Sequence, residues 1–221
     1  MDSQRDLVKW QWPFFLAFFV INFTGLLAIA YFGKDELHLY FNQHFHNSFF
    51  DEFFKYYTDV ATTYVLIGIS FYIIFTRTWR DFAFLSLAII SSSLIGTLIK
   101  RTFFVHGHRP TYYFELKNVE LRLIDGVESQ IPYTFPSGHS VLAIILCFYL
   151  CLIFKNRGIQ FLICGLTGLV AIGRVYLSKH FVIDTIGGSF LGLFFAILTY
   201  YLVWNFSHSL LDKKVFPSKK A

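Results

Sequence analysis

The sequence predicts an all-α protein: a polytopic bundle of six transmembrane helices with a short outer interfacial helix and a small outer hairpin. Composition is the first reason. Hydrophobic residues make up 55% of the 221 residues and charged residues only 15%, against about 25% charged residues in soluble proteins. So few charges cannot cover a core in water, which excludes a disordered chain, a disulfide-stapled secreted module and most soluble enzymes. We expect one integral-membrane domain over residues 1–221.

The second reason is a set of six segments that are free of Asp, Glu, Lys and Arg. They cover residues 10–33, 60–76, 82–99, 129–154, 158–173 and 185–211. Crossing ~30 Å of hydrocarbon takes about 20 helical residues, and a helix satisfies its own backbone amides. The fourth segment is apolar throughout only from Val141 onward, and the fifth is short, so we expect Arg174 at its end.

The first segment has a second interpretation. Arg5 and Lys9 precede it, and Ala28-Ile29-Ala30 resembles the cleavage site of a signal peptide. The run is long for a signal peptide and is followed at once by more of the same protein. We therefore favour an uncleaved helix.

The charges predict the orientation of the bundle. One end receives both termini and the turns at 77–81 and 155–157, and it holds ten of the 19 basic residues but four of the 14 acidic ones. Cytoplasmic loops carry an excess of Lys and Arg. Both termini are therefore expected in the cytoplasm, with the other end facing the periplasm or exterior of a bacterial inner membrane. All four tryptophans fall near the cytoplasmic end, as in an interfacial belt.

Two elements are expected at the outer face. Ser48 and Asp51 have the spacing of a capping box, and aromatic residues follow at helical spacing. Residues 48–59 are therefore expected to form a short amphipathic helix on the interface. Further on, residues 119–124 and 127–131 flank Asp125-Gly126, a pair that favours the tight turn of a β-hairpin.

Three polar clusters interrupt the apolar pattern, and the span count places all of them at the outer face. They are Lys100, Arg101 and Arg109; Pro136-Ser137-Gly138-His139; and Arg174, His180 and Asp184. Arginine donors match phosphate oxygens, and the free amides at a helix start bind anions. A carboxylate four residues after an imidazole can hold one ring nitrogen and leave the other free as a nucleophile or base. The clusters predict one phosphate site with a reactive histidine.

The charges of these clusters agree with a phosphate ligand. Lys100, Arg109 and Arg174 carry three positive charges against Asp184 alone, and the surplus matches a phosphate monoester, whose second pKa is about 6. The net charge of the chain is +5, but the basic residues do not gather on one soluble module, so no nucleic-acid partner is expected.

The remaining histidines and the cysteines do not predict a metal site or another cofactor. His44 with His46, and His106 with His108, lack carboxylate or thiol companions at ligand spacing, so loop histidines are favoured over metal ligands. The three cysteines, at 147, 151 and 164, form neither a disulfide framework nor a CxxC pair.

The motifs Arg109-Pro110, Pro136-Ser137-Gly138-His139 and Arg174-x5-His180-x3-Asp184 occur in one order along the chain. In that order they resemble the three signature motifs of the type 2 phosphatidic acid phosphatase superfamily. The resemblance covers residues 95–190 by motif and the whole chain by span count. Asn42-Gln43, Asp51 and Thr58 also resemble the loop after the first span of bacterial members.

The resemblance implies a metal-independent mechanism. His180 would attack phosphorus to form a phosphohistidine, Asp184 would fix the tautomer of His180, and His139 would protonate the leaving oxygen and then activate water. The residues implied to stabilise the phosphoryl oxygens are Lys100, Arg109, Ser137, the Gly138 amide and Arg174.

The chain departs from the family motifs at two places. The first motif usually has a lysine seven residues before its arginine, where this chain has Thr102. Lys100 is expected to make that phosphate contact, with Arg101 as the alternative. The third motif usually begins Ser-Arg and here reads Gly173-Arg174, so one hydroxyl group is missing.

These features predict an integral-membrane lipid phosphate or diphosphate phosphatase, whose partners are its lipid substrate and the membrane lipids. Undecaprenyl diphosphate, phosphatidylglycerol phosphate, phosphatidic acid and the lipid A phosphates are all candidate substrates. One alternative is a phosphotransferase of the same family that moves a phosphoryl group between lipids such as undecaprenyl diphosphate and lipid A. Another is an anion transporter, but that would need a polar pathway or broken helices within the bilayer, and the charges here lie at one face.

Overall fold

The computed structural model describes residues 7–127 and 133–216, and these residues form helices and no strand. The predicted all-α class is confirmed. In chain order the helices are α1 (Leu7–Phe32), α2 (Lys34–His44), α3 (Ser48–Asp59), a π-helix (Val60–Tyr64), α4 (Val65–Thr76), α5 (Trp79–Thr102), α6 (Pro110–Glu115), α7 (Gly138–Ile153), α8 (Arg157–Tyr176) and α9 (Val182–Asn205).

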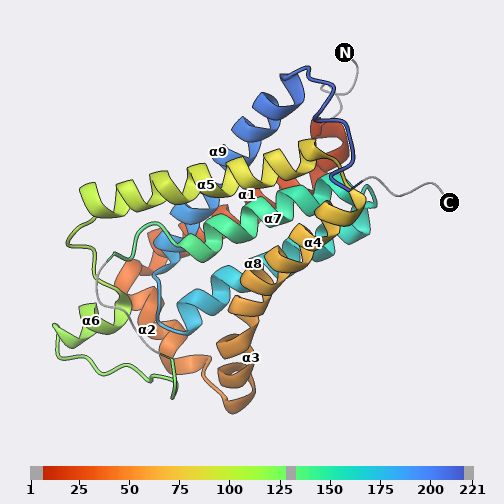
Figure 1. Ribbon diagram of the computed structural model, residues 1–221. Coiled ribbons are helices and arrows are strands. Elements are labelled where there is room, and N and C mark those ends of the chain that lie inside the picture. Colours follow the sequence, from red (N-terminus) through yellow and green to blue (C-terminus); the bar gives the residue numbers. More distant parts are fainter. Residues whose placement is uncertain (1–6, 128–132, 217–221) are drawn as a thin grey trace.

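Helix α7 lies at the centre of the bundle, in contact with α1, α5, α8 and α9 (Figure 1). Its side chains are buried on all sides, and Ile145, Phe148 and Tyr149 are completely enclosed. A helix that is apolar all round belongs in such a position. It has 16 residues and begins at Gly138, directly after Pro136 and Ser137, so it is shorter than the charge-free segment at 129–154. Because other helices surround it, α7 does not need to match the full thickness of the bilayer.

The outer helices are long, apolar and exposed to the surroundings. Five of them reach a length and hydropathy suited to crossing a membrane: Gln11–Phe32, Ser48–Thr76, α5, α8 and α9. Large apolar side chains such as Phe23, Phe71 and Leu94 are more than half exposed, which a soluble protein would not tolerate over so large an area. With α7 as the sixth apolar helix, this is an integral membrane protein, and the predicted six-helix bundle is confirmed.

Helix α3 is the amphipathic helix that the sequence predicts at 48–59, with two differences. Its N-cap is Asn47, whose side chain accepts a hydrogen bond from Phe50 N, and not Ser48. The helix is also not separate from the following span, because α3 runs through the π-helix directly into α4. The sequence contains no Gly or Pro at 59–60 that would end it.

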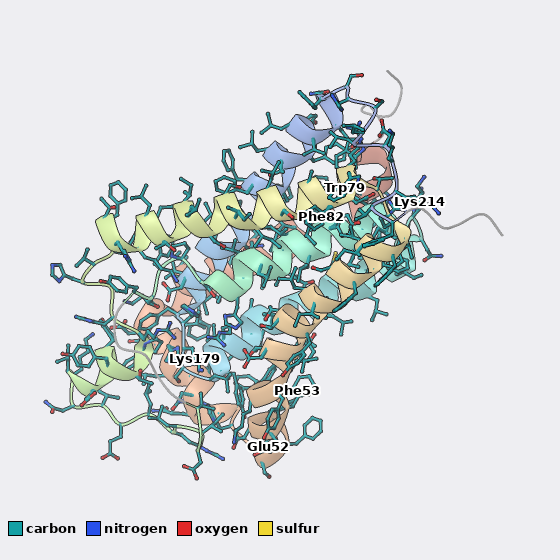
Figure 2. All side chains as sticks on the ribbon, in the orientation of Figure 1. Glu52, Phe53, Trp79, Phe82, Lys179 and Lys214 are labelled. Atoms are coloured by element: carbon teal, nitrogen blue, oxygen red, sulfur yellow. The ribbon has the colours of Figure 1, made fainter. Side chains whose placement is uncertain are left out.

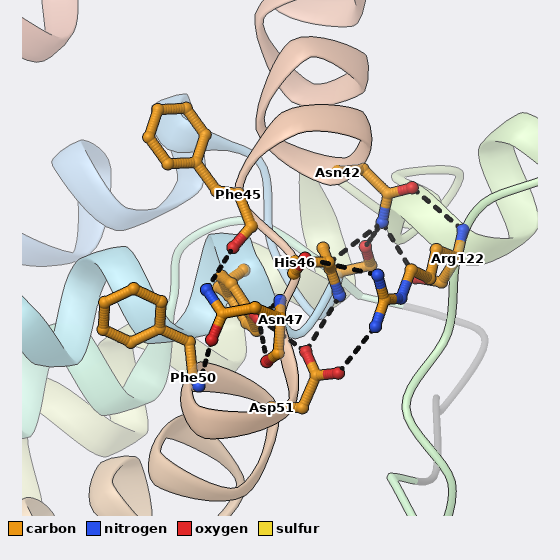
Figure 3. A network of polar contacts seen from close by, with 9 residues as sticks. Asn42, Phe45, His46, Asn47, Phe50, Asp51 and Arg122 are labelled. Carbon is orange, nitrogen blue, oxygen red and sulfur yellow. Dashed lines mark hydrogen bonds and ion pairs between the residues drawn. The ribbon is translucent and has the colours of Figure 1, made fainter.

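The segment predicted to form a hairpin is held by polar contacts and not by strand pairing in its described part. Residues 119–127 contain a turn at Asp125-Gly126 and no strand, and residues 128–131 of the prediction lie outside the described residues. Asn42 and Arg122 exchange two hydrogen bonds of 2.9 Å, and Asp51 pairs with Arg122 at 3.0 Å and with His46 at 3.2 Å (Figure 3). The contacts of Asn42 and Asp51 with Arg122 therefore hold this segment in place of the expected backbone hydrogen bonds between two strands.

The two ends of the bundle differ in character. At one end the C-terminal segment pairs with the start of α5, through Trp79 N to Lys213 O at 3.0 Å and an Arg80–Asp212 ion pair at 2.8 Å. The start of α1 lies at the same end (Figure 1). Lys179, which precedes His180, lies at the opposite end from Trp79 and Lys214 (Figure 2). The described parts near the termini therefore lie away from the predicted phosphate site.

Candidate active site

The start of α7 offers free backbone amides to a ligand. The first bond within the helix runs from Val141 N to Ser137 O, which leaves the amides of residues 138–140 without an intrahelical partner. Ser137 N donates to Asp184 O over 2.9 Å and so fixes α7 to the first turn of α9. Gly138 is exposed, and a Cβ there would meet no atom within 4 Å. The positive end of the α7 dipole therefore faces open space.

The loop between α8 and α9 turns back so that His180 meets the end of α8. Arg174 O accepts hydrogen bonds from Lys179 N and His180 N, both at 3.1 Å. The turn holds Ser178 in the left-handed region at φ 51°, which costs on the order of 1–3 kcal/mol for a residue other than glycine. The buried His38 Nε2 lies 3.1 Å from Ser178 Oγ and supports this conformation.

His180 is held by Thr134 and Asp184. Thr134 Oγ1 donates to Asp184 Oδ2 over 2.5 Å and lies 3.3 Å from His180 Nδ1. The direct distance from His180 Nδ1 to Asp184 Oδ2 is 3.6 Å, which is too long for a hydrogen bond. The side chains of His180 and Asp184 are 2% and 3% exposed. With Nδ1 fixed in this way, Nε2 is the free nitrogen of the ring.

Two of the cations that the motifs predict, Arg109 and Arg174, lie within electrostatic reach of this histidine. Arg109 and Arg174 repel each other electrostatically, and both act on the His180 ring. Arg174 is 5% exposed. Within the described chain, buried Arg109 Nε, Arg174 Nε and Ser137 Oγ have no hydrogen-bond partner. Buried polar atoms normally have one, so this arrangement is suited to an anionic ligand with several acceptor oxygens.

Lys100 and Arg101 differ in their surroundings. Lys100 interacts electrostatically with Arg109, Arg174 and Asp184, and it lines a cavity of about 210 Å³ together with Gly138. Arg101 is exposed. The geometry therefore favours Lys100 over Arg101 as the cation that takes part in the site.

Two residues at the site were not predicted from the sequence. Thr134 links His180 to Asp184 as described above. Asp59, the last residue of α3, has its Oδ1 3.1 Å from Nε2 of His139, 80 positions further along the chain. A threonine before a Phe-Pro pair and an acid at the end of an aromatic helix carry no spacing signal, so only the tertiary structure reveals them.

Burial sets the protonation state of His180. It lowers the pKa of the imidazole to about 4, because a buried imidazolium is poorly solvated, while Asp184 acts in the opposite direction. Burial also lowers the pKa of Arg109. At neutral pH His180 is therefore uncharged, and Nε2 carries the lone pair that a nucleophile needs.

Acidification is expected to destabilise the protein through two buried histidines. The pKa values of His180 and His38 are both lowered to about 4 by burial, against about 6.5 in an unfolded chain. Between these values the unfolded chain binds more protons than the folded one, so stability falls as the pH drops from about 6.5 towards 4. Each imidazole contributes up to about 3 kcal/mol to this loss.

Thermal denaturation in detergent at pH 7, 6 and 5 measures this loss of stability. His38→Gln should weaken the pH dependence, and an unchanged slope would contradict the assignment.

The three cysteines gather away from this site. One ligand atom from each of Cys147, Cys151 and Cys164 lies within 4.8 Å of the others, and all three thiols are free and buried. Cys147 lies eight residues after His139 on α7, or about 12 Å along the helix. The sequence did not predict this cluster, because Cys164 is far from the other two cysteines along the chain. The cluster takes no part in the arrangement around His180.

Comparison with known proteins identifies the family. Residues 81–208 match the PAP2 superfamily, and this region is more than half of the chain. The chain belongs to the PAP2 superfamily. The resemblance that the three motifs predict is confirmed.

Two bacterial relatives share part of this PAP2 sequence. The chain is 38% identical over 87 residues to phosphatidylglycerophosphatase B of Bacillus subtilis (strain 168), which covers 35% of this chain and 41% of that protein. It is 26% identical over 145 residues to the lipid A 4'-phosphatase of Porphyromonas gingivalis, which covers 63% of this chain and 61% of that protein. The chain therefore matches less than two thirds of the length of either relative. It is a membrane PAP2 protein related to lipid phosphatases.

The PAP2 fold is also seen in a solved structure, that of a transmembrane PAP2 type phosphatidylglycerolphosphate phosphatase from Bacillus subtilis. The TM-score is 0.62 and the identity is 21%, over 88% of this chain and 98% of the other. At this identity the similarity concerns the fold. It agrees with a membrane PAP2 fold for this chain.

Proposed function

We propose that this PAP2 protein is an integral-membrane phosphatase that hydrolyses a lipid phosphomonoester or diphosphate through a phosphohistidine on His180. One observation carries the proposal: a neutral, buried imidazole stands beside two arginines whose buried Nε atoms have no partner in the described chain. A bound phosphate would accept hydrogen bonds from these donors and present its phosphorus to the ring. The names of the two relatives support a lipid phosphate as the substrate.

In the first step, Nε2 of His180 forms a bond to phosphorus while the bond from phosphorus to the leaving oxygen breaks. The Nδ1 proton stays on the ring, where Thr134 and Asp184 stabilise the positive charge that develops. His139 gives a proton to the leaving oxygen. The lipid then departs as an alcohol, or as a monophosphate when the substrate is a diphosphate.

In the second step, His139 takes a proton from water as the water oxygen attacks phosphorus. The bond between phosphorus and His180 breaks, and inorganic phosphate leaves. Throughout, Lys100, Arg109, Arg174 and the amides at the start of α7 face the charged equatorial oxygens. Such electrostatic stabilisation is the main contribution to phosphoryl transfer. In this proposal the cations of the chain supply the charge that Mg²⁺ supplies in kinases.

A cavity lined by Lys100 supports a lipid as the substrate. It measures about 210 Å³ and lies between α5 and α7, with Lys100 and Gly138 at one end and Ser92 and Ile145 at the other. A lipid phosphate held at Lys100 would thus have space for the start of its tail within the bundle. A water-soluble phosphate would leave this space unused.

We also propose that the site faces the exterior and that the termini are cytoplasmic. The site and the described C-terminal segment lie at opposite ends of the bundle, and the segments that the sequence assigns to the cytoplasmic end contain ten of the 19 basic residues. An excess of basic residues is typical of cytoplasmic loops.

A release assay on the purified protein tests the function. We expect inorganic phosphate from at least one of phosphatidic acid, phosphatidylglycerol phosphate, undecaprenyl diphosphate and a lipid A phosphate. Chelators should leave the rate unchanged, and vanadate, which mimics the transferred phosphoryl group, should inhibit it. A phosphorylated lipid acceptor without free phosphate would instead identify a phosphotransferase. No turnover of any of these lipids would contradict the proposal.

A further inference from the structure

Each of the two histidines at the site has a carboxylate beside it, but the two pairs differ in their exposure to water. The side chains of His180 and Asp184 are 2% and 3% exposed. Those of His139 and Asp59 are 31% and 60% exposed, with Nε2 and Oδ1 3.1 Å apart. A nucleophile benefits from dehydration, whereas a group that must activate water in a second step needs contact with water. The exposures fit these separate roles.

The π-helix places Asp59 where it can reach His139. Asp59 is the last residue of α3, and the next five residues, Val60–Tyr64, form the π-helix. This segment contacts both α7 and α8, and buried Thr62 donates its hydroxyl hydrogen bond to Thr58 O at 2.7 Å. π-turns inside helices occur frequently at functional sites. Here the contact of the π-helix with α7 keeps Asp59 beside His139 at the start of α7.

Gly173 allows α3 to come close to α8 beside the site. A Cβ at this position would lie 2.6 Å from Thr58 Cγ2 and 2.7 Å from Phe54 Cδ1, closer than real atoms approach. The side chains of α3 therefore occupy the space that a serine would need at the start of the third motif. The same approach brings Asp59 within electrostatic reach of Arg174. The absence of a side chain at Gly173 and the closeness of Asp59 to Arg174 thus belong to one packing contact between α3 and α8.

We infer that Asp59 is a positioning residue for His139, an inference that rests on the proposed phosphatase function. The Asp59 carboxylate accepts a hydrogen bond from Nε2–H of His139 and thereby fixes the ring. Nδ1 is then the nitrogen that gives a proton to the leaving oxygen in the first step and takes one from water in the second. No atom of Asp59 touches the substrate in this arrangement.

The inference is tested by measuring kcat/KM of the same enzyme preparation with two substrates. Asp59→Asn keeps the shape of the side chain and removes its charge. For a lipid phosphate, whose alkoxide needs a proton to leave, kcat/KM should fall by about tenfold to a hundredfold, a part of the roughly 10²–10⁴-fold that a positioned general acid contributes. For a short-chain aryl phosphate, whose phenolate leaves without a proton, kcat/KM should fall less than about threefold. Retained turnover of the aryl ester also shows that the variant folds.

The matched control is Glu52→Gln, the same chemical change on an exposed side chain of the same helix. It should leave both substrates unaffected. In a His139→Ala background, Asp59→Asn should cause less than about a twofold further loss, because residues that act as one unit are not additive.

Equal losses on both substrates would overturn the inference, because they would indicate a structural role only. Unchanged kcat/KM for the lipid ester in an active enzyme would overturn it as well, and would leave the phosphatase proposal intact. A wild-type protein that hydrolyses neither ester would overturn the phosphatase proposal and this inference together. The wild-type measurement therefore separates the two failures.

Discussion

Replacement of His180 by alanine is expected to abolish phosphate release, with a loss of at least about 10⁴-fold, as for other covalent nucleophiles. The structure gives the reason. His180 is the neutral imidazole whose Nδ1 is fixed by Thr134 and Asp184, and both Arg109 and Arg174 act on its ring. When the wild-type protein is mixed with lipid labelled in its phosphate and the reaction is rapidly quenched, acid-labile labelled phosphate should remain on the protein. The same phosphate should be absent from the variant.

His208→Ala is the matched control for this prediction. His208 is exposed and belongs to the segment after α9, at the other end of the bundle, so its loss should leave phosphate release unchanged. The thermal midpoint and elution volume of His180→Ala in detergent show whether the variant is folded. A folded variant that retains more than about one per cent of wild-type release would rule out His180 as the nucleophile.

Gly188→Ala is expected to be the most damaging change outside the charged residues. A Cβ at this position of α9 would lie 2.4 Å from Ser137 O and 3.0 Å from Ser140 Cβ. Because Ser137 O belongs to the backbone, α7 itself must move away from α9, and the Ser137 N to Asp184 O bond of 2.9 Å is then disturbed. A displacement of about 1 Å in such a site lowers the rate by about a hundredfold, and overpacking costs about 1–3 kcal/mol.

The control is Gly165→Ala in α8, where a Cβ would meet no atom within 4 Å. This change should keep full activity and gain up to about 1 kcal/mol from helix propensity. Phosphate release and the thermal midpoint, measured for both variants in one detergent, provide the comparison. If Gly188→Ala matched Gly165→Ala in both quantities, the contact between α7 and α9 would not control the phosphate site.

Much of the fold and of the site could be predicted from the sequence, because both depend on local patterns. Charge-free segments mark the long helices, and a helix start after Pro136 or an imidazole four residues before Asp184 has a known local geometry. The superfamily resemblance then connects three motifs that are far apart along the chain. In the structure Arg109 and Arg174 interact electrostatically with His180, and Lys100 interacts with both arginines.

The features that the sequence did not predict depend on long-range packing. The link from Thr134 to His180 spans 46 positions, and that from Asp59 to His139 spans 80. The expected hairpin depended on the turn residues Asp125-Gly126, and that turn is present. Arg122, however, pairs with Asn42 of the distant helix α2 and not with a neighbouring strand. The continuity of α3 with α4 was also missed, because the acidic residues before Val60 suggested the edge of a membrane span.

That continuous helix has a consequence for where a lipid would be cleaved. It contains 29 residues from Ser48 to Thr76, and the apolar part from Val60 onward is about 25 Å long at 1.5 Å per residue, close to the ~30 Å of hydrocarbon. Because Asp59 directly precedes this apolar part, it marks the depth in the bilayer at which lipid tails end and lipid head groups begin. His139 lies beside Asp59. A lipid could therefore lose its phosphate at its resting depth in the leaflet, without being lifted from the bilayer.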